Sequence, residues 1–366
     1  MESHRALLRS LASNFHHSIL VLGEPPGEPW EESGGHPRVQ VRSHCNWHPT
    51  FRVLSGWRAA LKEFQPDVFL GLDEPYCLQT FLFKTWCESN RTPFIFLSCQ
   101  NIDRPLPFPF SWLERQVLAN AAGAWFLNAN AYERARRRGF VGAGKVIPIG
   151  IDPERYPCLD MGSAAAGQRG SEPFTVGYVG RLVPEKGVAD LIEACAKVNV
   201  RLLVAGEGPD RKRLSALAAG KGVETKWLGG VVSSKIASVY SQMDLLVLPS
   251  RTTRRWKEQF GRVLVEAMAS GVPVAGSDSG EIPNVLGDAG RVFPEGNVGA
   301  LAALIAEVRG DKDLCRSMAD AGLRRVREKL TWSRIAGLVN SLIEETLRVH
   351  STHQAGNDDN GASGVG

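Results

Sequence analysis

Two glutamates, Glu258 and Glu266, flank a Phe260-Gly261 turn in the segment Glu-Gln-Phe-Gly-Arg-Val-Leu-Val-Glu. Their spacing does not place both carboxylates on one helical face, because a helix turns once every 3.6 residues. It fits a helix that begins near Arg262, with Glu258 before it and Glu266 one turn inside. The backbone N–H groups at such a helix start favour a diphosphate, and flanking carboxylates would accept hydrogen bonds from hydroxyls. A surface helix with two solvated glutamates fits the spacing alone equally well.

A second segment that could bind phosphate lies upstream, in Gly180-Arg181-Leu-Val-Pro-Glu-Lys186. It follows a predicted strand and precedes a predicted helix, and open α/β sheets bind ligands at this edge. Arg181 as a fork and Lys186 as a point charge could hold one diphosphate. Gly206 and Gly208, at the next strand end, permit a close backbone approach to a ligand. Taken singly, each pattern also fits an ordinary strand–helix loop.

Strands and helices alternate along the whole chain, which predicts parallel sheets with helices on both faces. Two such runs of similar size predict an α/β protein with two doubly wound, Rossmann-like domains. The strands that we predict are Ser18–Leu22, Arg38–Arg42, Asp67–Gly71, Pro93–Ser98, Ala124–Asn128, Val146–Ile149, Phe174–Val179, Arg201–Ala205, Thr225–Leu228, Leu245–Leu248, Val272–Ala275 and Gly290–Phe293.

Composition sets the expected domain boundaries. Residues 1–152 form the predicted first domain, and a Gly/Ala/Ser-rich stretch at 153–173 without periodicity is typical of a linker. Residues 174–331 form the second domain, and 332–349 form one amphipathic helix. The polar segment 350–366 is predicted to be disordered.

The start of the first domain departs from the expected pattern. A doubly wound domain usually opens with its central strand and a Gly-rich turn. Here Ser3–Ser13 is already predicted to be the first helix, and Ser18–Leu22 the second strand. We therefore expect the first domain to be incomplete at its start.

Composition and charge exclude several classes of protein. The 366 residues are 43% hydrophobic and 22% charged, as in soluble globular proteins, and no apolar run reaches the roughly 18 residues of a membrane span. The start lacks the apolar core of a secretory signal. A net charge of +4 does not indicate nucleic-acid binding. Seven scattered cysteines without a Cys-x-x-Cys pair favour neither disulfides nor zinc, and we expect a cytoplasmic protein.

Positive charge is concentrated locally in two clusters, although the net charge of the chain is small. These clusters are Arg134 with Arg136–Arg138, and Arg251 with Arg254, Arg255 and Lys257. A solvated helix face or loop is the simpler interpretation. The alternative is contact with anionic lipid headgroups at the inner face of the membrane, or with an anionic substrate.

Taken together, these segments resemble glycosyltransferase family four, a group of retaining enzymes of GT-B fold. The resemblance covers about 174–349 through the Glu-x7-Glu motif, the upstream Arg/Lys pair, Leu245–Ser250 and Val285–Gly290. It is looser in the first half, where it rests on Gly71–Pro75, Gln100-Asn101 and Gly150–Asp152.

The resemblance implies a role for each matching residue. Arg181 and Lys186 would bind the donor diphosphate and stabilise the leaving group, and Glu258 would hold hydroxyls of the donor sugar. Glu266 would hold the ribose. The remaining donor-binding positions would act through backbone groups: Gly180, Gly206, Phe260, Gly261, Arg262 and Val263.

For the whole chain, the resemblance implies two domains facing across a cleft, with the helix at 332–349 crossing back to the first. The implied activity is a retaining, hexosyltransferase-type transfer from a UDP- or GDP-sugar to a glycan, glycolipid or small-molecule acceptor. It needs no metal and no cofactor, and Asp311-Lys-Asp313 is interpreted as surface. Many members carry a His in the first domain where this chain has Ser98-Cys-Gln-Asn101.

Other functions remain as alternatives. A truncated, non-catalytic nucleotide-sugar-binding homologue would share the second domain. A nucleotide-sugar 2-epimerase is less favoured, because such enzymes lack the Glu-x7-Glu pattern. A dehydrogenase is excluded, since no Gly-x-Gly-x-x-Gly with a following acidic residue opens either domain.

Overall fold

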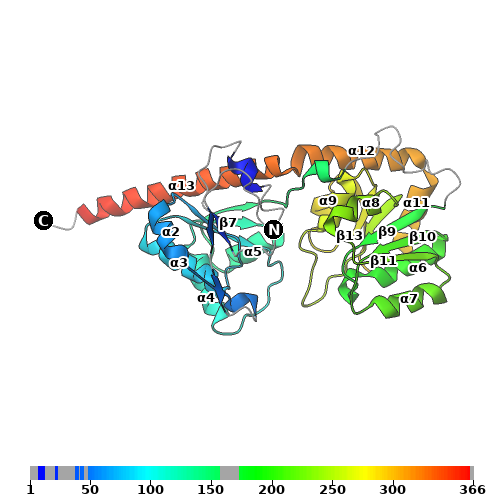
Figure 1. Ribbon diagram of the computed structural model, residues 1–366, viewed down its shortest axis with the longest axis horizontal. Coiled ribbons are helices and arrows are strands. Elements are labelled where there is room, and N and C mark those ends of the chain that lie inside the picture. Colours follow the sequence, from blue (N-terminus) through cyan, green and yellow to red (C-terminus); the bar gives the residue numbers. More distant parts are fainter. Residues whose placement is uncertain are drawn as a thin grey trace. The chain divides into compact units, whose positions relative to one another are not determined.

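A computed structural model describes residues 7–12, 21–23, 38–40, 42–44, 48–156 and 173–362. The chain divides into two compact units (Figure 1), one of Met1–Gly150 with Trp332–Gly366 and the other of Ile151–Thr331. Each unit has a parallel sheet of its own. The expected α/β fold with two Rossmann-like halves is confirmed.

The second unit is built on six parallel strands in the order β11-β10-β9-β12-β13-β14. The chain moves outward from β9 to β11 and then returns to the other side of β9, so the order reverses between β9 and β12. Such switch points are where open α/β sheets bind ligands. The bounds are β9 Thr175–Val179, β10 Arg201–Ala205, β11 Thr225–Gly229, β12 Leu245–Leu248, β13 Val274–Ser277 and β14 Gly290–Phe293.

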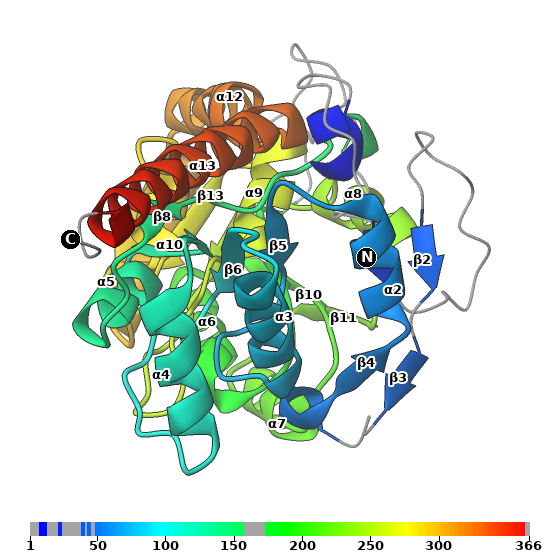
Figure 2. The ribbon, with the colours of Figure 1, turned by 90° about the vertical axis from the view of Figure 1, so that its left-hand side faces the viewer.

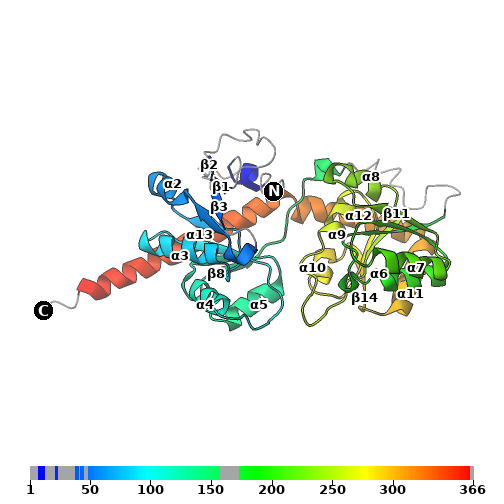
Figure 3. The same ribbon diagram turned by 60° about the horizontal axis from the view of Figure 1, so that its bottom comes forward.

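The helices of the second unit pack against one another around the sheet. α6 contacts α7 and α11 (Figure 3), α9 contacts α10 and α12, and α11 also contacts α12. Strands β9 and β12 are buried at every position, as expected for central strands covered on both faces. The helices are α6 Val188–Val198, α7 Arg211–Gly220, α8 Ile236–Tyr240, α9 Arg262–Ala269, α10 Ile282–Leu286, α11 Val298–Gly310 and α12 Lys312–Lys329, with 3-10 turns η3 Pro184–Lys186 and η4 Ser233–Lys235.

The first unit has a four-stranded parallel sheet in the order β5-β6-β7-β8, a parallel pair β1-β2 and an antiparallel pair β3-β4. Its strands are β1 Val21–Gly23, β2 Arg38–Gln40, β3 Arg42–His44, β4 Val53–Ser55, β5 Phe69–Gly71, β6 Phe94–Ser98, β7 Gly123–Phe126 and β8 Ala143–Val146. Its helices are α2 Trp57–Phe64, α3 Leu78–Ser89, α4 Phe110–Asn120, α5 Ala129–Arg137 and α13 Trp332–Ala362, with the 3-10 turn η1 Pro49–Phe51.

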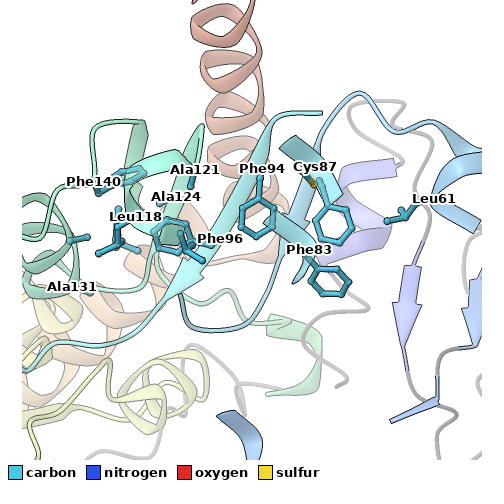
Figure 4. Close-up of a cluster of buried hydrophobic side chains, with 14 of the residues drawn as sticks. Leu61, Phe83, Cys87, Phe94, Phe96, Leu118, Ala121, Ala124, Ala131 and Phe140 are labelled. Atoms are coloured by element: carbon cyan, nitrogen blue, oxygen red, sulfur yellow. The ribbon is translucent and has the colours of Figure 1, made fainter. Parts of the chain in front are cut away.

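Alternate residues of β6 and β7 serve two separate cores, because successive side chains of a strand point to opposite faces. Phe94 and Phe96 pack with Phe83 and Leu118, beneath α3 and α4 (Figure 4). The other face, which includes Ile95, packs against α13 and the helical segment 7–12. In Figure 2, α13 runs beside β8 while α3 and α4 lie apart from it. The sheet of the first unit is therefore covered on both sides.

Three expectations for secondary structure differ from the structure. The strand predicted at 146–149 lies instead at Ala143–Val146, because Pro148 cannot donate to a ladder. The tail predicted to be disordered from 350 is helical to Ala362, since no proline interrupts a helix that is already formed and propagation costs little. Within the linker predicted at 153–173, residues 153–155 form the 3-10 turn η2 Pro153–Arg155, and 157–172 lie outside the described residues.

Among the helices in the described part of the chain, none is both long enough and apolar enough to cross a bilayer.

Candidate donor site

The loops that follow β9, β10 and β12 bring the predicted residues to the carboxyl edge of the second sheet. Arg181 and Lys186 lie in the β9 loop, Gly206 directly follows β10, and Glu258 lies between β12 and α9. Because β9 and β12 are the two strands at the switch point, their loops are neighbours although some 70 residues separate them in the chain. The fold therefore assembles one polar site from distant segments.

Lys186 and Glu258 form the centre of this site. Lys186 Nζ lies 2.6 Å from Glu258 Oε2, and the Lys186 side chain is 15% exposed against 9% for that of Glu258. Ser250 Oγ donates to the same carboxylate oxygen at 2.8 Å. The Lys186 ammonium also lies 4.8 Å from the centroid of the Trp256 ring. A part-buried ammonium is thus held in place by a carboxylate and an aromatic face.

The segment that follows β13 supports Glu258 through its backbone. Glu281 N–H donates to the Glu258 carbonyl at 3.2 Å, and Ser277 Oγ donates to the Ser250 carbonyl at 2.5 Å. Gly280 has φ of 60°, and a Cβ there would lie 2.0 Å from the Glu258 carbonyl oxygen. Only glycine fits such an approach in the left-handed region. The Gly280 turn therefore fixes the position of Glu258.

Helix α9 begins beside this carboxylate. Its N-cap, Gly261, has φ of 85°, and the preceding Phe260 is 4% exposed. The first N–H groups of a helix have no partner within the helix, so those of Arg262 and Val263 are available for an anion. The predicted helix start at residue 262 is found in the structure.

Glu266 lies one turn inside α9 and accepts bonds on both carboxylate oxygens. Tyr240 Oη donates to Oε2 at 2.7 Å, and Arg262 Nε lies 2.8 Å from Oε1. Tyr156 faces the same pair, and burial together with the Glu266 charge raises the pKa of Tyr156 to about 12. Both phenols are therefore protonated donors at neutral pH. A ligand hydroxyl at Glu266 would compete with Arg262, whose side chain is 47% exposed, rather than with the buried Tyr240.

Arg181 differs from Lys186, because it is exposed. Its carbonyl accepts a hydrogen bond of 2.8 Å from Tyr178 Oη, which fixes the backbone, while its guanidinium makes no ion pair or hydrogen bond with any described residue. A Cβ at Gly206 would lie 1.8 Å from the Gly180 carbonyl oxygen. The close approach that Gly206 permits is thus, in this structure, one between the β9 and β10 loops.

Four residues of the site have no role in the sequence-based prediction: Ser250, Trp256, Tyr240 and Tyr156. Ser250 could have been found, because it directly follows the apolar strand β12 and its Pro249. The other three come from loops and a short helix whose packing the pattern of residues does not reveal.

The second basic cluster is partly neutralised. Arg251 Nε donates to Asp190 Oδ2 at 2.6 Å, and Arg251 Nη2 donates to Oδ1 of this buried carboxylate. Arg254 and Arg255 are exposed in the same loop as Trp256. The loop therefore carries exposed positive charge next to Lys186.

The first basic cluster is only partly a solvated face, because Arg136 and Arg137 are exposed whereas Arg134 is buried, which corrects the simpler interpretation given above. Arg134 is 2% exposed and lies 2.7 Å from Glu114 Oε1, and Arg138 pairs with Glu114 and Asp103. Arg136 stacks on Phe140. Because α5 packs near α4, charges that look like a surface run in the sequence hold two helices together.

The Asp311-Lys-Asp313 segment lies at the start of α12, and the exposure of its Asp313 agrees with its interpretation as surface. Asp311 Oδ1 accepts a bond of 2.9 Å from Leu314 N–H and so caps α12, and the Asp313 side chain is 95% exposed.

Comparison with known proteins finds a family match that lies largely within the second unit. Residues 164–325 match the family model described as Glycosyl transferases group 1. A GDP-mannose-dependent alpha-(1-6)-phosphatidylinositol monomannoside mannosyltransferase of Mycobacterium tuberculosis is 30% identical over 224 residues, which is 57% of this chain and 58% of that protein. A D-inositol 3-phosphate glycosyltransferase of Nocardia farcinica is 31% identical over 266 residues, 65% of this chain and 56% of that protein. The chain thus spans little more than half of these relatives.

Solved structures share the fold over most of the chain. Sucrose-phosphate synthase from Thermosynechococcus elongatus superposes with a TM-score of 0.71 at 19% identity, covering 93% of this chain and 92% of that one. The HepE protein of Anabaena in complex with UDP and glucose superposes with a TM-score of 0.68 at 18% identity, covering 93% and 95%. These matches support the GT-B fold class.

Proposed function

We propose that this chain is a retaining glycosyltransferase that moves a sugar from a nucleotide-diphosphate donor to a hydroxyl-bearing acceptor. The observation that carries the proposal is the Lys186–Glu258–Ser250 arrangement beside the start of α9, at the switch point of the second sheet. A fixed cation, a fixed carboxylate and free helix N–H groups meet there. Phosphate and sugar hydroxyls are the groups that such a site would recognise.

The chemistry follows from where charge develops. When the bond between the anomeric carbon and the diphosphate oxygen breaks, positive charge grows on the sugar and negative charge on the diphosphate. Lys186, the exposed Arg181 and the α9 N–H groups would stabilise the leaving diphosphate. Because these groups can supply the positive charge, we propose transfer without a metal ion.

Glu258 and Glu266 would orient the donor. Lys186 and Ser250 both contact Glu258 Oε2. A donor diphosphate would attract Lys186, and sugar hydroxyls would then donate to the carboxylate. Glu266 would accept from the ribose after displacement of Arg262, the exposed one of its partners.

The relatives and structural neighbours suggest which donors to test. One relative is by its name GDP-mannose-dependent, and HepE is solved with UDP-glucose. We propose a UDP- or GDP-sugar as donor, and a glycan, a glycolipid or a small polyol as acceptor.

We also propose a cytoplasmic location with peripheral contact to an anionic membrane, although the arginines of the first cluster support that contact less than their number suggests. Arg134 is buried and Arg138 is ion-paired, so only Arg136 and Arg137 remain exposed. Sedimentation with liposomes of increasing anionic-lipid content tests this contact, and binding that does not depend on that content would refute it.

The test of activity is release of nucleoside diphosphate from UDP-glucose, GDP-mannose and ADP-glucose, with myo-inositol or methyl α-D-mannopyranoside as acceptor. We expect one donor to be used at the same rate with and without EDTA, and the NMR spectrum of the product to show the anomeric configuration of the donor. Inversion, or loss of activity with EDTA, would contradict the proposal. Tight nucleotide binding without turnover would favour the non-catalytic homologue.

A further inference from the structure

The segment that connects the two units delivers one side chain, that of Tyr156, to the donor site. The 3-10 turn η2 directly precedes it, and Asp152 caps this turn by accepting from Glu154 N–H at 3.2 Å. Tyr156 N–H donates to the Pro153 carbonyl at 3.0 Å, and the residue is 4% exposed. A buried tyrosine hydroxyl usually has a hydrogen-bond partner, so the groups around it indicate what it does.

Two contacts fasten this turn to the second unit. Ile151 N–H donates at 2.8 Å to the carbonyl of Leu330, the C-cap of α12. Arg155 Nη2 donates at 3.3 Å to Ser233 Oγ in η4, which leads directly into α8. Because α8 ends at Tyr240, the turn is held next to the helix that carries the main partner of Glu266.

The two tyrosines approach Glu266 together. The ring centroids of Tyr156 and Tyr240 lie 6.4 Å apart, and Tyr240 Oη donates to Glu266 Oε2 at 2.7 Å. Burial is the main reason that the pKa of Tyr156 rises to about 12, and its interactions with Glu266 raise the pKa further, whereas those with Arg262 lower it. The Tyr156 hydroxyl thus donates toward the carboxylate and offers its oxygen to the guanidinium.

Arg262 is the member of this cluster that a ligand can replace. Its side chain is 47% exposed, against 11% for that of Glu266, and its Nε lies 2.8 Å from Glu266 Oε1. Exposed ion pairs contribute little to stability, so displacement of the guanidinium costs little. It would leave two acceptors side by side, Glu266 Oε1 and the Tyr156 oxygen. A guanidinium supplies several donors in one plane, and two hydroxyls on neighbouring carbons also supply more than one.

We propose that Tyr156 and Glu266 together bind a vicinal diol, in which one hydroxyl donates to Glu266 Oε1 and its neighbour donates to the Tyr156 oxygen. This inference rests on the proposed function, in which the diol is that of the donor's ribose. Tyr156 is then a binding residue supplied by the segment between the units, and it makes the site selective for ribonucleotides.

The experiment measures binding of nucleoside diphosphates to the full chain by calorimetry. Whichever of UDP, GDP and ADP binds most tightly is compared with its 2′-deoxy and 3′-deoxy analogues. The wild type should bind each analogue roughly fivefold more weakly, which is the effect of one lost hydrogen bond. In Tyr156→Phe the ring remains and only the hydroxyl is removed, so one of these two losses should shrink to less than about twofold while the other persists.

Tyr132→Phe is the matched control, because it removes a phenol that accepts a hydrogen bond of 3.2 Å from Arg136 Nε in α5 of the first unit. It should discriminate between the nucleotides as the wild type does. A purely structural role of Tyr156 would weaken binding of the ribonucleotide and of both analogues by the same factor.

Two results would overturn the proposal. One is a pair of affinity ratios in Tyr156→Phe that equal those of the wild type. The other needs no variant: a wild type that binds both deoxy analogues as tightly as the ribonucleotide. In either case the ribonucleotide itself still binds, whereas failure of the proposed donor site would abolish binding of all three ribonucleotides, so the two failures are distinct.

Discussion

Lys186 is the side chain on which the proposed chemistry depends most. Its side chain is 15% exposed and its ammonium is oriented by Glu258 and by Trp256, so it needs little rearrangement to meet a diphosphate. Preorganised charge of this kind stabilises a transition state more than it stabilises the ground state.

Replacement of this cation should therefore lower the rate of transfer more than it lowers the stability of the chain. For Lys186→Ala we expect kcat to fall on the order of 10²–10³-fold, the usual cost of one preorganised charge donor. Lys62→Ala, at an exposed lysine of α2, is the matched control and should retain the wild-type rate. A steady-state rate for Lys186→Ala within a factor of three of the wild type would remove Lys186 from the site.

A second single residue, Glu74, makes the free energy of unfolding depend on pH. Burial raises the pKa of Glu74 in the folded chain to about 7, above its ordinary value of 4.5. Between these two pH values the folded chain keeps a proton on Glu74 that the unfolded chain has lost. The free energy of unfolding should therefore decrease as pH rises from about 4.5 to about 7, and this loss should be absent in Glu74→Gln. Thermal unfolding across this range checks it, and a Tm of Glu74→Gln below that of the wild type at pH 8 would indicate a structural role instead.

At the scale of elements, α4 and α5 are joined by buried charge. Arg134 and Glu114 side chains are each 2% exposed and lie 2.7 Å apart. Removal of one partner from such a pair leaves the other buried without compensation.

Arg134→Ala should cost about 3 kcal/mol in the free energy of unfolding, the lower end of the range for a broken buried pair, because Arg138 still pairs with Glu114. Arg137→Ala is the matched control on the same helix. Its side chain is 60% exposed and lies 3.9 Å from Glu133, so its loss should cost less than about 1 kcal/mol. If urea unfolding shows that the two variants lose equal free energies of unfolding, the Arg134–Glu114 pair does not hold α4 and α5 together.

The sequence predicted these elements unevenly. Strands β9, β10 and β12 lie where continuous apolar runs place them, because a strand buried on both faces has a distinctive composition. The buried Arg134–Glu114 pair was not predicted, because Arg134 belongs to a run of arginines and such a run usually lies on a solvent-exposed face. Helix α12 was also missed, although the Asp311 cap marks its start.

At the scale of the whole molecule, the order of strands brings the site together. Reversal between β9 and β12 places Lys186 beside Glu258, which the chain separates by 72 residues. The resemblance to glycosyltransferase family four implied that both would contact the donor. Their mutual ion pair could not be predicted, because it depends on the path of the loops rather than on the pattern of residues.

Calorimetric titration of the full chain with UDP, GDP and ADP tests the donor site most directly. We expect one nucleotide to bind with a Kd well below those of the other two. The Arg181→Ala/Lys186→Ala variant should lose this binding, while Glu74→Gln should keep it. Binding of none of the three nucleotides, or equal binding by the double variant, would contradict a donor site built on Lys186 and Glu258.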